Sequence, residues 1–302
     1  MWTDIRKFKL SSGYEIPAIG LGTGTITPNE ADEAITSALE IGYRHIDTAF
    51  NYRNEAAIGQ AGDLFITTKL PHHANRAESV EKYLKHSLKD LGLEYVAMYL
   101  IHMPYGTEEG NNLTEATDNG NVTFENVDHL ALWKKMEEQV VAGRAKSIGL
   151  SNFSQSQILN IYNNTKIKPS NLEVESHAYF QQMELREFCK EYNIVITAYS
   201  PLGSPNDRKR VHKGTERIYP DKYNKTAAQI LLRRSVQSGL AVIPKSSNKD
   251  HQRENFDIFN FNLSEDDVAK IRNLDKGEIG RLFDFLGFFK DLNKIRKIPF
   301  HS

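Results

Sequence analysis

The feature that most constrains how this chain can fold is an alternation between short apolar runs and longer amphipathic runs. Eight short runs are rich in β-branched residues and have the length of buried strands. The runs between them carry apolar residues at helical spacing. The expected strands are Ile19–Gly22, Arg44–Ile46, Leu64–Thr68, Val96–Ile101, Ala145–Leu150, Asn171–Val174, Ile194–Ala198 and Ala241–Ile243. The expected helices are Asn29–Ile41, Ala77–Leu91, Asn126–Ala142, Ser154–Asn163, Gln182–Tyr192, Thr226–Ser238 and Lys249–Phe256.

Strands that alternate with helices pair in parallel, because each crossover returns the chain to the same end of the sheet. Eight such units in a chain of 302 residues suit a closed (β/α)8 TIM barrel, which takes about 250 residues. We therefore predict an α/β fold with one barrel domain spanning residues 1–302. Phe8–Leu10 and Glu15–Pro17 flank a Ser-Ser-Gly-Tyr turn, which predicts a β-hairpin in front of the barrel.

Some segments depart from the regular pattern. Only a short helix of about two turns fits between Tyr52 and Lys69, near the minimum for a parallel crossover. The irregular stretches Met103–Glu125 and Lys276–Ser302 predict long loops. The first of them follows the fourth strand, on the C-terminal face where barrels carry their active sites.

Composition argues against several classes of function. The formal net charge is -1, so the chain lacks the basic excess that binds the phosphates of nucleic acids. No apolar run reaches about 18 residues, so we expect no membrane span. The single cysteine, Cys189, cannot form an internal disulfide, and the first residues lack the apolar stretch of a signal peptide. We therefore expect a cytoplasmic protein.

Four polar side chains stand where this barrel would bring its strand ends together. Asp47 follows the second strand, Lys69 ends the third, His102 follows the fourth, and Tyr52 lies on the loop after the second. Each alone has a plain structural explanation, such as a helix cap or a solvated charge. Together they form a proton donor, since an ammonium lowers the pKa of a nearby tyrosine and a carboxylate holds that ammonium in place. The histidine donates a hydrogen bond to the same substrate oxygen, so the set predicts protonation of an oxyanion formed by hydride addition.

Two other motifs compete with this interpretation. Glycines at positions 20, 22 and 24, with Asp47 after the next strand, imitate a dinucleotide-binding fingerprint, but its third glycine is replaced by Thr25. His45 and Asp47, with His102 and His177, imitate a metal-hydrolase barrel. Further carboxylate ligands are not obvious, so we expect no metal.

Longer motifs carry a resemblance to a known family. They are Gly42-Tyr43-Arg44-His45-Ile46-Asp47-Thr48-Ala49 with Tyr52, Asn54 and Glu55, then Ile66-Thr67-Thr68-Lys69-Leu70, Leu100-Ile101-His102, Gly149-Leu150-Ser151-Asn152-Phe153, Ala198-Tyr199-Ser200-Pro201-Leu202-Gly203 and Ile243-Pro244-Lys245-Ser246. In this order they resemble the signatures of the aldo-keto reductase family, over essentially the whole chain. The resemblance implies a monomeric, NADPH-dependent enzyme that reduces an aldehyde or ketone to an alcohol, with a small-molecule carbonyl as its partner.

The resemblance also implies roles for individual residues. The implied catalytic tetrad is Asp47, Tyr52, Lys69 and His102, with Tyr52 as the general acid. Tyr199 is implied to stack on the nicotinamide, and Lys245 to hold the 2′-phosphate of NADPH, for which a cation is suitable. The full set implied to bind the cofactor is Thr23, Asp47, Ser151, Asn152, Glu173, Tyr199, Ser200, Leu202, Ser204, Lys245, Ser246, Asn248, His251 and Asn255.

Two departures from the family bear on the cofactor. A glutamine usually stands at the position of Glu173, and an ionised glutamate accepts hydrogen bonds but cannot donate one. Glu173 therefore either weakens cofactor binding or is protonated. The arginine often found after the phosphate-binding lysine is here His251, which carries less charge. Because Lys245-Ser246 is intact, we still expect NADPH, with NADH as a weaker alternative.

Other departures bear on the substrate. Aldose-reductase-like members carry tryptophans where this chain has Gly24, Pro71 and Met103, so we expect a wider, less aromatic pocket. Phe283 and Phe285 either supply an apolar wall or pack on the barrel exterior. The segments 102–104 and 22–25 look most like those of insect 3-dehydroecdysone reductases, which implies a bulky ketosteroid such as 3-dehydroecdysone and a role in ecdysteroid metabolism. The alternatives are a broad-specificity aldehyde or aldose reductase and a non-catalytic NADPH-binding member of the family.

Overall fold

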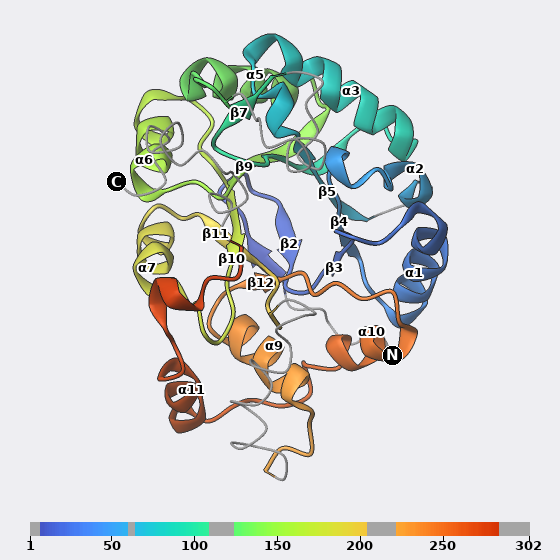
Figure 1. Ribbon diagram of the computed structural model, residues 1–302, viewed down its shortest axis with the longest axis vertical. Coiled ribbons are helices and arrows are strands. Elements are labelled where there is room, and N and C mark those ends of the chain that lie inside the picture. Colours follow the sequence, from blue (N-terminus) through green and yellow to red (C-terminus); the bar gives the residue numbers. More distant parts are fainter. Residues whose placement is uncertain (1–6, 60–63, 109–123, 204–221, 284–302) are drawn as a thin grey trace.

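The computed structural model describes residues 7–59, 64–108, 124–203 and 222–283. Eight parallel strands form one sheet in which the neighbours follow chain order (Figure 1). All pairings between these strands are parallel. The strands are β3 (Leu21–Gly22), β4 (His45–Asp47), β5 (Phe65–Leu70), β6 (Val96–Ile101), β9 (Ala145–Ser151), β10 (Asn171–Glu175), β11 (Val195–Tyr199) and β12 (Ala241–Val242).

The first and last strands meet and close the sheet into a barrel. Parallel bridges join Ile19 to Val242 and Gly22 to Lys245, and the Gly20 N–H donates to the Val242 carbonyl at 2.9 Å. A side chain at Gly22 would place its Cβ 2.6 Å from the carbonyl oxygen of Ile243, so the closing contact requires glycine there. The predicted (β/α)8 fold is confirmed.

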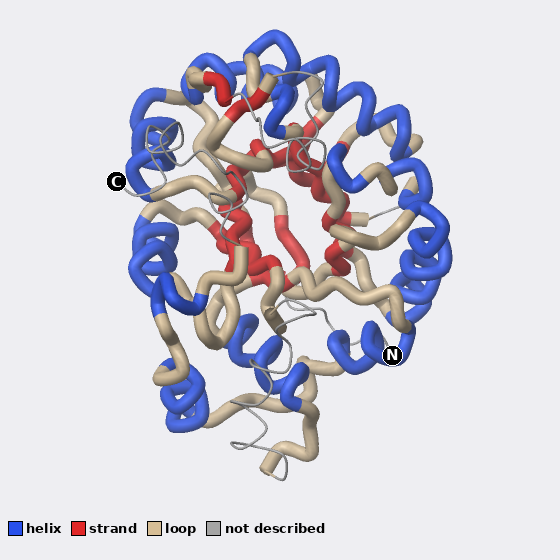
Figure 2. The backbone as a smooth tube through the Cα atoms, in the orientation of Figure 1, coloured by secondary structure: helices blue, strands red, loops and turns tan. Residues whose placement is uncertain are grey.

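Helices surround the barrel on its outer side (Figure 2). Their apolar faces pack on the outward side chains of the strands, as Trp133 and Leu84 do in the main core. Local signals begin several of them, since Ser154 and Thr226 each form a capping box with a glutamine at the third helical position. The helices are α1 (Pro28–Ile41), α2 (Glu55–Ile58), α3 (Val80–Leu91), α5 (His129–Val141), α6 (Gln155–Asn164), α7 (Met183–Glu191), α9 (Ala227–Gln237), α10 (Lys249–Phe256) and α11 (Glu265–Arg272).

The predicted hairpin is present as β1 (Lys7–Lys9) and β2 (Glu15–Pro17). Leu10 and Ile16 of this hairpin form one buried cluster with Met98, Leu100 and Ala241 of the barrel strands. The hairpin therefore fills the apolar interior of the barrel at the end remote from the strand carboxyl termini.

Several elements differ from the sequence-based expectation. Helix α2 spans four residues, shorter than the two turns expected. A small hairpin of β7 (Gly106–Thr107) and β8 (Phe124–Glu125) and the helix α11 lie in segments for which no element was expected. The short 3-10 helices η1 (Phe50–Tyr52), η2 (His72–Ala74), η3 (Ala77–Ser79) and η4 (Gly277–Gly280) complete the described elements. Among the described residues, no helix is both long and apolar enough to cross a bilayer.

Candidate active site

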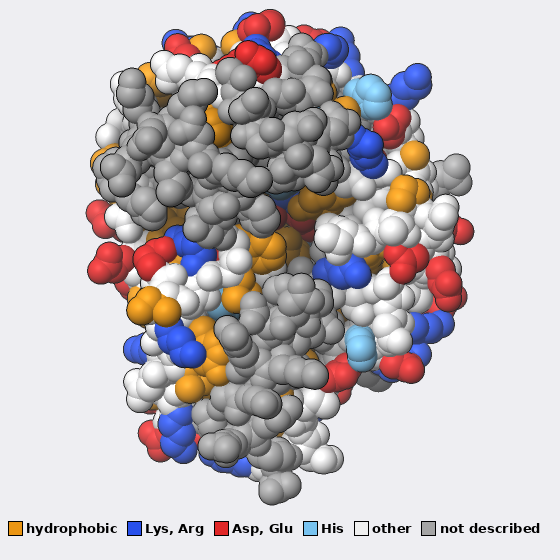
Figure 3. Space-filling model, in the orientation of Figure 1, with side chains coloured by type: hydrophobic (Ala, Val, Ile, Leu, Met, Phe, Trp, Pro, Cys, Tyr) orange, Lys and Arg blue, Asp and Glu red, His pale blue; other side chains and the backbone are white. Residues whose placement is uncertain are grey.

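The four residues singled out in the sequence converge on the carboxyl ends of neighbouring strands. Asp47 is the last residue of β4, Lys69 lies near the end of β5, and His102 directly follows β6. Tyr52 ends the 3-10 helix η1, which follows β4 after two residues. Viewed along the barrel axis, the space-filling surface is hollowed at its centre, with hydrophobic side chains around the hollow (Figure 3).

Lys69 is the centre of a buried charge cluster. Its ammonium lies 2.6 Å from Asp47 Oδ1 and 3.3 Å from Glu173 Oε1, and it donates to the Thr48 carbonyl at 3.0 Å. The side chains of all three residues are at most 4% exposed. Burial opposes the charge on Lys69, but the Asp47 carboxylate first, and then the Glu173 carboxyl group, outweigh burial and raise the pKa of Lys69. The lysine is thus held charged and in one position.

The Tyr52 ring lies close to both Lys69 and His102. The Lys69 ammonium lies 5.5 Å from the centre of the ring, and the His102 imidazole meets the ring edge-on at 5.8 Å. Burial raises the pKa of Tyr52 to about 12, although Lys69 acts to lower it. Lys69 thus acts on the pKa of Tyr52 in the expected direction, but the net shift is upward because desolvation of the phenolate is larger. The phenol is protonated at neutral pH.

His102 is a neutral imidazole. Burial and the nearby Lys69 charge lower its pKa well below the usual value. Its Nδ1 is buried and has no hydrogen-bond partner in the described part of the chain. One ring nitrogen of a neutral imidazole donates and the other accepts, so His102 has hydrogen-bonding capacity to offer a ligand.

Glu173 brings a second carboxyl group to the cluster. Burial first, and then the nearby Asp47 carboxylate, raise the pKa of Glu173 well above its usual value. Glu173 Oε2 and Asp47 Oδ2 are both buried without a donor among the described residues. A proton on Glu173 would supply the missing donor, so the geometry favours a neutral Glu173 over a second buried negative charge.

On the other side of the barrel mouth, three residues that the resemblance implies for nicotinamide binding are joined by hydrogen bonds. The Tyr199 hydroxyl donates to Asn152 Oδ1 at 2.9 Å, and Asn152 Nδ2 donates to Ser151 Oγ at 3.0 Å. Tyr199 ends β11 and is half-buried, and the next residue, Ser200, has a positive φ of 48°. Leu202, two residues further along the chain, is buried. Ser204 lies outside the described residues.

The residues implied for the 2′-phosphate gather at the start of α10. Asn248 is the N-cap of this helix, and its Oδ1 accepts the N–H of the exposed His251 at 2.9 Å. Ser246 Oγ accepts the Asn248 N–H at 3.1 Å. Lys245 lies just before this turn, beside the strand contact with Gly22. A helix N-terminus with a cation and hydroxyl beside it favours an anion. Asn255 is buried on the same helix.

One of the implied pocket residues, Gly24, lies against the Tyr52 ring. A Cβ at Gly24 would lie 3.4 Å from Tyr52 Cζ, so the glycine leaves the ring uncovered on that side. Thr23, next to it, is buried and donates to the Asp47 carbonyl at 2.9 Å. Met103 Sδ accepts from Asn152 Nδ2 at 3.2 Å. Of the other implied pocket residues, Pro71 caps η2 directly after β5, Phe283 meets the Tyr199 ring edge-on at 5.8 Å, and Phe285 lies outside the described residues.

Sequence reasoning left two supporting residues without a role. Asn54 accepts from Thr48 Oγ1 at 2.9 Å and donates to the carbonyls of Thr23 and Ile26, both at 3.0 Å, so it fixes the loop that carries Tyr52. Glu175 at the end of β10 binds the backbone of residues 282 and 283. The strand-end position of Glu175, two residues after Glu173, was the available signal.

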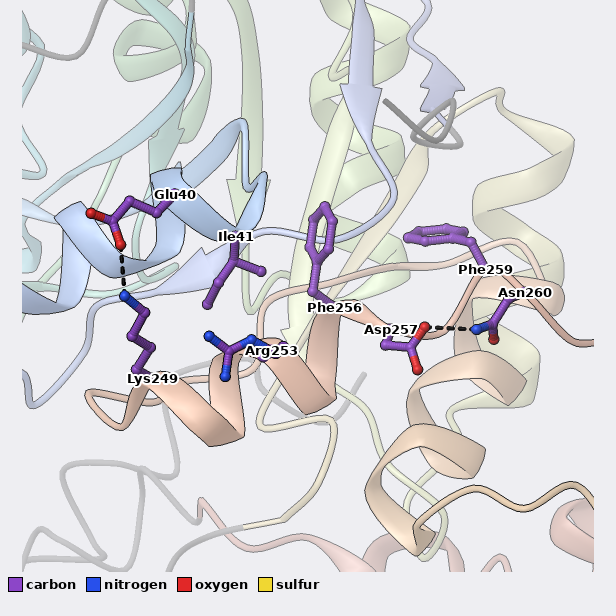
Figure 4. Close-up of a pocket in the computed structure, with 8 residues that line it drawn as sticks. All are labelled: Glu40, Ile41, Lys249, Arg253, Phe256, Asp257, Phe259 and Asn260. Atoms are coloured by element: carbon purple, nitrogen blue, oxygen red, sulfur yellow. Dashed lines mark hydrogen bonds and ion pairs between the residues drawn. The ribbon is translucent and has the colours of Figure 1, made fainter. Parts of the chain in front are cut away.

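A separate hollow of about 760 Å³ lies outside the barrel, between the end of α1 and α10 (Figure 4). Lys249 pairs with Glu40 at 2.7 Å, and Arg253 pairs with Asp250 at 3.0 Å. Because the cations are paired and exposed, this groove offers no anion site comparable to the barrel mouth. The described residues contain no group of three or more His, Cys, Asp or Glu placed to hold a metal ion.

Comparison with known proteins agrees with this geometry. A profile of the aldo/keto reductase family matches residues 18–276. The chain is 39% identical over 289 residues to aldo-keto reductase family 1 member A1 of Gallus gallus, covering 88% of each chain. It is 39% identical over 285 residues to aldose reductase C of Dictyostelium discoideum, again covering 88% of each.

A solved structure extends the likeness to three dimensions. The aldose reductase of Schistosoma japonicum superposes with a TM-score of 0.86 at 39% identity, covering 94% of this chain and 96% of the other. With the closed barrel and the convergence of Asp47, Tyr52, Lys69 and His102 at its mouth, these matches show that the chain belongs to the aldo/keto reductase family of oxidoreductases, which act on carbonyl and alcohol groups.

Proposed function

We propose that the protein is an NADPH-dependent reductase that converts a bulky apolar ketone to an alcohol, with Tyr52 as the proton donor. The observation that carries the proposal is the contact of the Tyr52 ring with both a buried ammonium and a neutral imidazole. A protonated phenol next to a fixed positive charge suits the protonation of an alkoxide, because the charge stabilises the phenolate that remains. A pure binding protein has no need of this arrangement.

Each neighbour of Tyr52 takes a distinct part in the proposed reaction. Lys69 opposes the burial that raises the Tyr52 pKa, so the phenol releases its proton more readily than burial alone would allow. Asp47 holds Lys69 at 2.6 Å. His102, kept neutral, donates a hydrogen bond that orients the carbonyl oxygen toward the phenol.

The residues at the opposite side of the mouth fit a phosphorylated nicotinamide cofactor. Lys245, Ser246 and the N-terminus of α10 match a phosphate monoester in charge and in donors. Tyr199 and Asn152 present an aromatic face and an amide beside the catalytic group. When bound, NADPH supplies the hydride. NADH is the weaker alternative, because the exposed His251 adds less charge than an arginine would.

The substrate class follows from the surroundings of Tyr52. Gly24, Pro71 and the pliable Met103 leave room for a large apolar ring system where indoles would narrow the pocket. This supports a ketosteroid such as 3-dehydroecdysone, with a part in ecdysteroid metabolism. A broad-specificity aldehyde or aldose reductase is the second candidate, favoured by the likeness to proteins named aldose reductase. We further propose a single barrel domain over residues 1–302, acting as a monomer in the cytoplasm.

The test is NADPH oxidation across a panel of carbonyls, from glyceraldehyde through aromatic aldehydes to 3-ketosteroids including 3-dehydroecdysone, with NADH in parallel. Efficient turnover of the ketosteroids is expected. Turnover of small aldehydes alone would instead support the second candidate, a broad-specificity aldehyde reductase. NADPH binding without any turnover would favour the non-catalytic alternative.

Tyr52→Phe tests the mechanism in the same assay. The variant should lose roughly 10²–10⁴-fold in kcat, while its Kd for NADPH, measured by fluorescence, stays within about twofold. Tyr14→Phe is the matched control, since Tyr14 is 48% exposed on the hairpin at the other end of the barrel. Full activity of Tyr52→Phe would refute the assigned role.

A further inference from the structure

The segment after α11, residues Asp275–Phe283, is here called the strap. It leaves α11 and runs beside α7 toward the carboxyl ends of β10 and β11 (Figure 1). Two hydrogen bonds fasten its beginning to the loop between β10 and α7. Asp275 Oδ1 accepts the N–H of Gln181 at 3.2 Å, and the Lys276 N–H donates to the Tyr179 carbonyl at 2.9 Å.

The middle of the strap lies directly on the backbone of the same loop. A Cβ built at Gly280 would lie 1.9 Å from the Tyr179 carbonyl oxygen, so no other residue fits this contact without displacing the strap. The guanidinium of Arg281 lies 4.4 Å from the centre of the Phe180 ring, a cation–π contact. The strap therefore contacts the loop at its beginning and again at Gly280 and Arg281, whereas Ile279 between these contacts is exposed.

The end of the strap is held by a buried carboxylate. Glu175 Oε1 accepts the Leu282 N–H at 2.7 Å, and Oε2 accepts the Phe283 N–H at 3.0 Å. His177 Nε2 lies 3.0 Å from Oε1. Since His177 Nδ1 accepts the Tyr179 N–H at 3.3 Å, a neutral imidazole carries its proton on Nε2 and donates it to Glu175.

These contacts use both oxygens of a side chain that is only 1% exposed, beside a histidine that is 0% exposed. A buried carboxylate is tolerated when its oxygens receive hydrogen bonds, and such charge-assisted bonds are strong. An amide could not replace it, because its NH₂ group would face one of the two backbone donors. The chemistry of the contact therefore selects a carboxylate at position 175.

The Glu175 carboxylate positions the ring of Phe283. That ring meets the Tyr199 ring edge-on, at 5.8 Å between centres and 75° between planes. Tyr199 in turn bonds to Asn152, whose amide reaches the carbonyl of His102 at 3.1 Å. The strap thus ends as an apolar group at the mouth, connected to the residues around the reacting carbonyl.

We propose that Glu175 is a positioning residue that determines substrate specificity: it docks the end of the strap at the barrel mouth and so fixes Phe283 as the wall against which a large apolar ketone packs. The inference rests on the proposed function, because it concerns the same site. We expect small aldehydes not to reach from the carbonyl to Phe283, so that the wall acts on large substrates alone. One well-packed apolar contact accounts for about a tenfold difference in affinity.

The test compares Glu175→Gln with the wild-type enzyme on a 3-ketosteroid and on glyceraldehyde. The expected result is about a tenfold fall in the ratio of the two kcat/KM values, through a higher KM for the ketosteroid. Gly280→Ala displaces the strap at a different point and should give the same fall. Glu184→Gln, at an exposed glutamate in the first turn of α7, is the control for loss of charge and should leave the ratio unchanged.

Hydrogen exchange gives a readout that does not depend on turnover. The amides of Leu282 and Phe283 should be protected in the wild type and exchange markedly faster in Glu175→Gln. Equal losses of kcat/KM on both substrates would mean that Glu175 is merely structural and would overturn the inference. An unchanged ratio of the two kcat/KM values in both variants, with the ketosteroid still turned over, would overturn it as well. Turnover of neither substrate by the wild-type enzyme would instead overturn the proposed function itself.

Discussion

Replacing Glu173 by glutamine should make the protein more stable at high pH relative to wild type, and the advantage should shrink as the pH falls. The neutral amide keeps the shape of the side chain and removes the ionisable group from the cluster with Asp47 and Lys69. In the folded wild type, burial and Asp47 raise the pKa of Glu173 far above the unfolded value of about 4.5. Above about pH 4.5, the carboxyl group of Glu173 loses its proton in the unfolded chain but keeps it in the folded protein.

The direction and size of the effect follow from this difference in bound protons. Because the folded state holds one more proton, the free energy of unfolding falls as pH rises from about 4.5 toward the raised pKa, by about 1.4 kcal/mol per pH unit. For 302 residues, an unfolding entropy of about 2.1 cal/mol/K per residue converts this into roughly 2 °C per pH unit. The Tm of Glu173→Gln minus that of the wild type should therefore rise by about this amount per unit.

The assay is thermal unfolding of both proteins at one heating rate between about pH 5 and pH 8, with urea denaturation as a second measure. Glu94→Gln, at an exposed glutamate, is the control and should show a flat difference. An infrared band of a protonated carboxylic acid, present in the wild type and absent from Glu173→Gln at neutral pH, would locate the proton. A flat Tm difference for Glu173→Gln, or one that falls with pH, would refute the reasoning, because it would mean that Glu173 is ionised in the folded protein.

Three further outcomes test the packing and the site. Gly149→Ala should cost about 1–3 kcal/mol of stability by urea denaturation, because the added Cβ would lie 2.4 Å from the Asn171 carbonyl oxygen; an unchanged midpoint contradicts the close strand contact. Gln252→Ala should raise the Kd for NADPH, since the Gln252 amide holds the Ser246 carbonyl at 2.9 Å, and the proposed phosphate site fails if the affinity is unaltered. The phenolate absorbance that distinguishes wild type from Tyr52→Phe should not appear in the cofactor-free protein until the pH approaches about 12; its appearance near pH 10 would show that burial does not dominate.

The order of elements was predictable because strands and helices differ in the period of their apolar residues. The range Val96–Ile101 was expected as a strand and α10 as a helix over Lys249–Phe256, and both have those bounds. Helix α11 was missed because only Asp267 and Ile271 are buried, which gives too weak an apolar period, although Ser264 before an acidic first turn was an available start signal. The hairpin of β7 and β8 was missed because its strands are two residues long, too short for any periodicity.

The convergence of the four site residues was predictable because parallel strands of a barrel end on the same face. The net pKa of Tyr52 was not, because its largest cause is desolvation, which depends on packing that the sequence does not display. The link between Glu175 and the strap was missed for a different reason. Glu175 accepts from the backbone N–H groups of Leu282 and Phe283, which lie 107 and 108 positions later in the chain. Because every residue except proline offers such a donor, the sequence carries no signal for this contact.

The same two-residue period that builds the barrel interior also aims the proposed chemistry. On β5, Thr67 meets Met98 and Lys69 meets Leu100 of the neighbouring strand, and these residues share one face. Toward the hairpin this face is apolar, where Met98 and Leu100 pack with Leu10. At the mouth it presents Lys69 to Asp47. A shift of β5 by one residue would therefore turn the ammonium toward the helices and expose Thr68 inside, so the register that completes the core is also the register that fixes the proton donor.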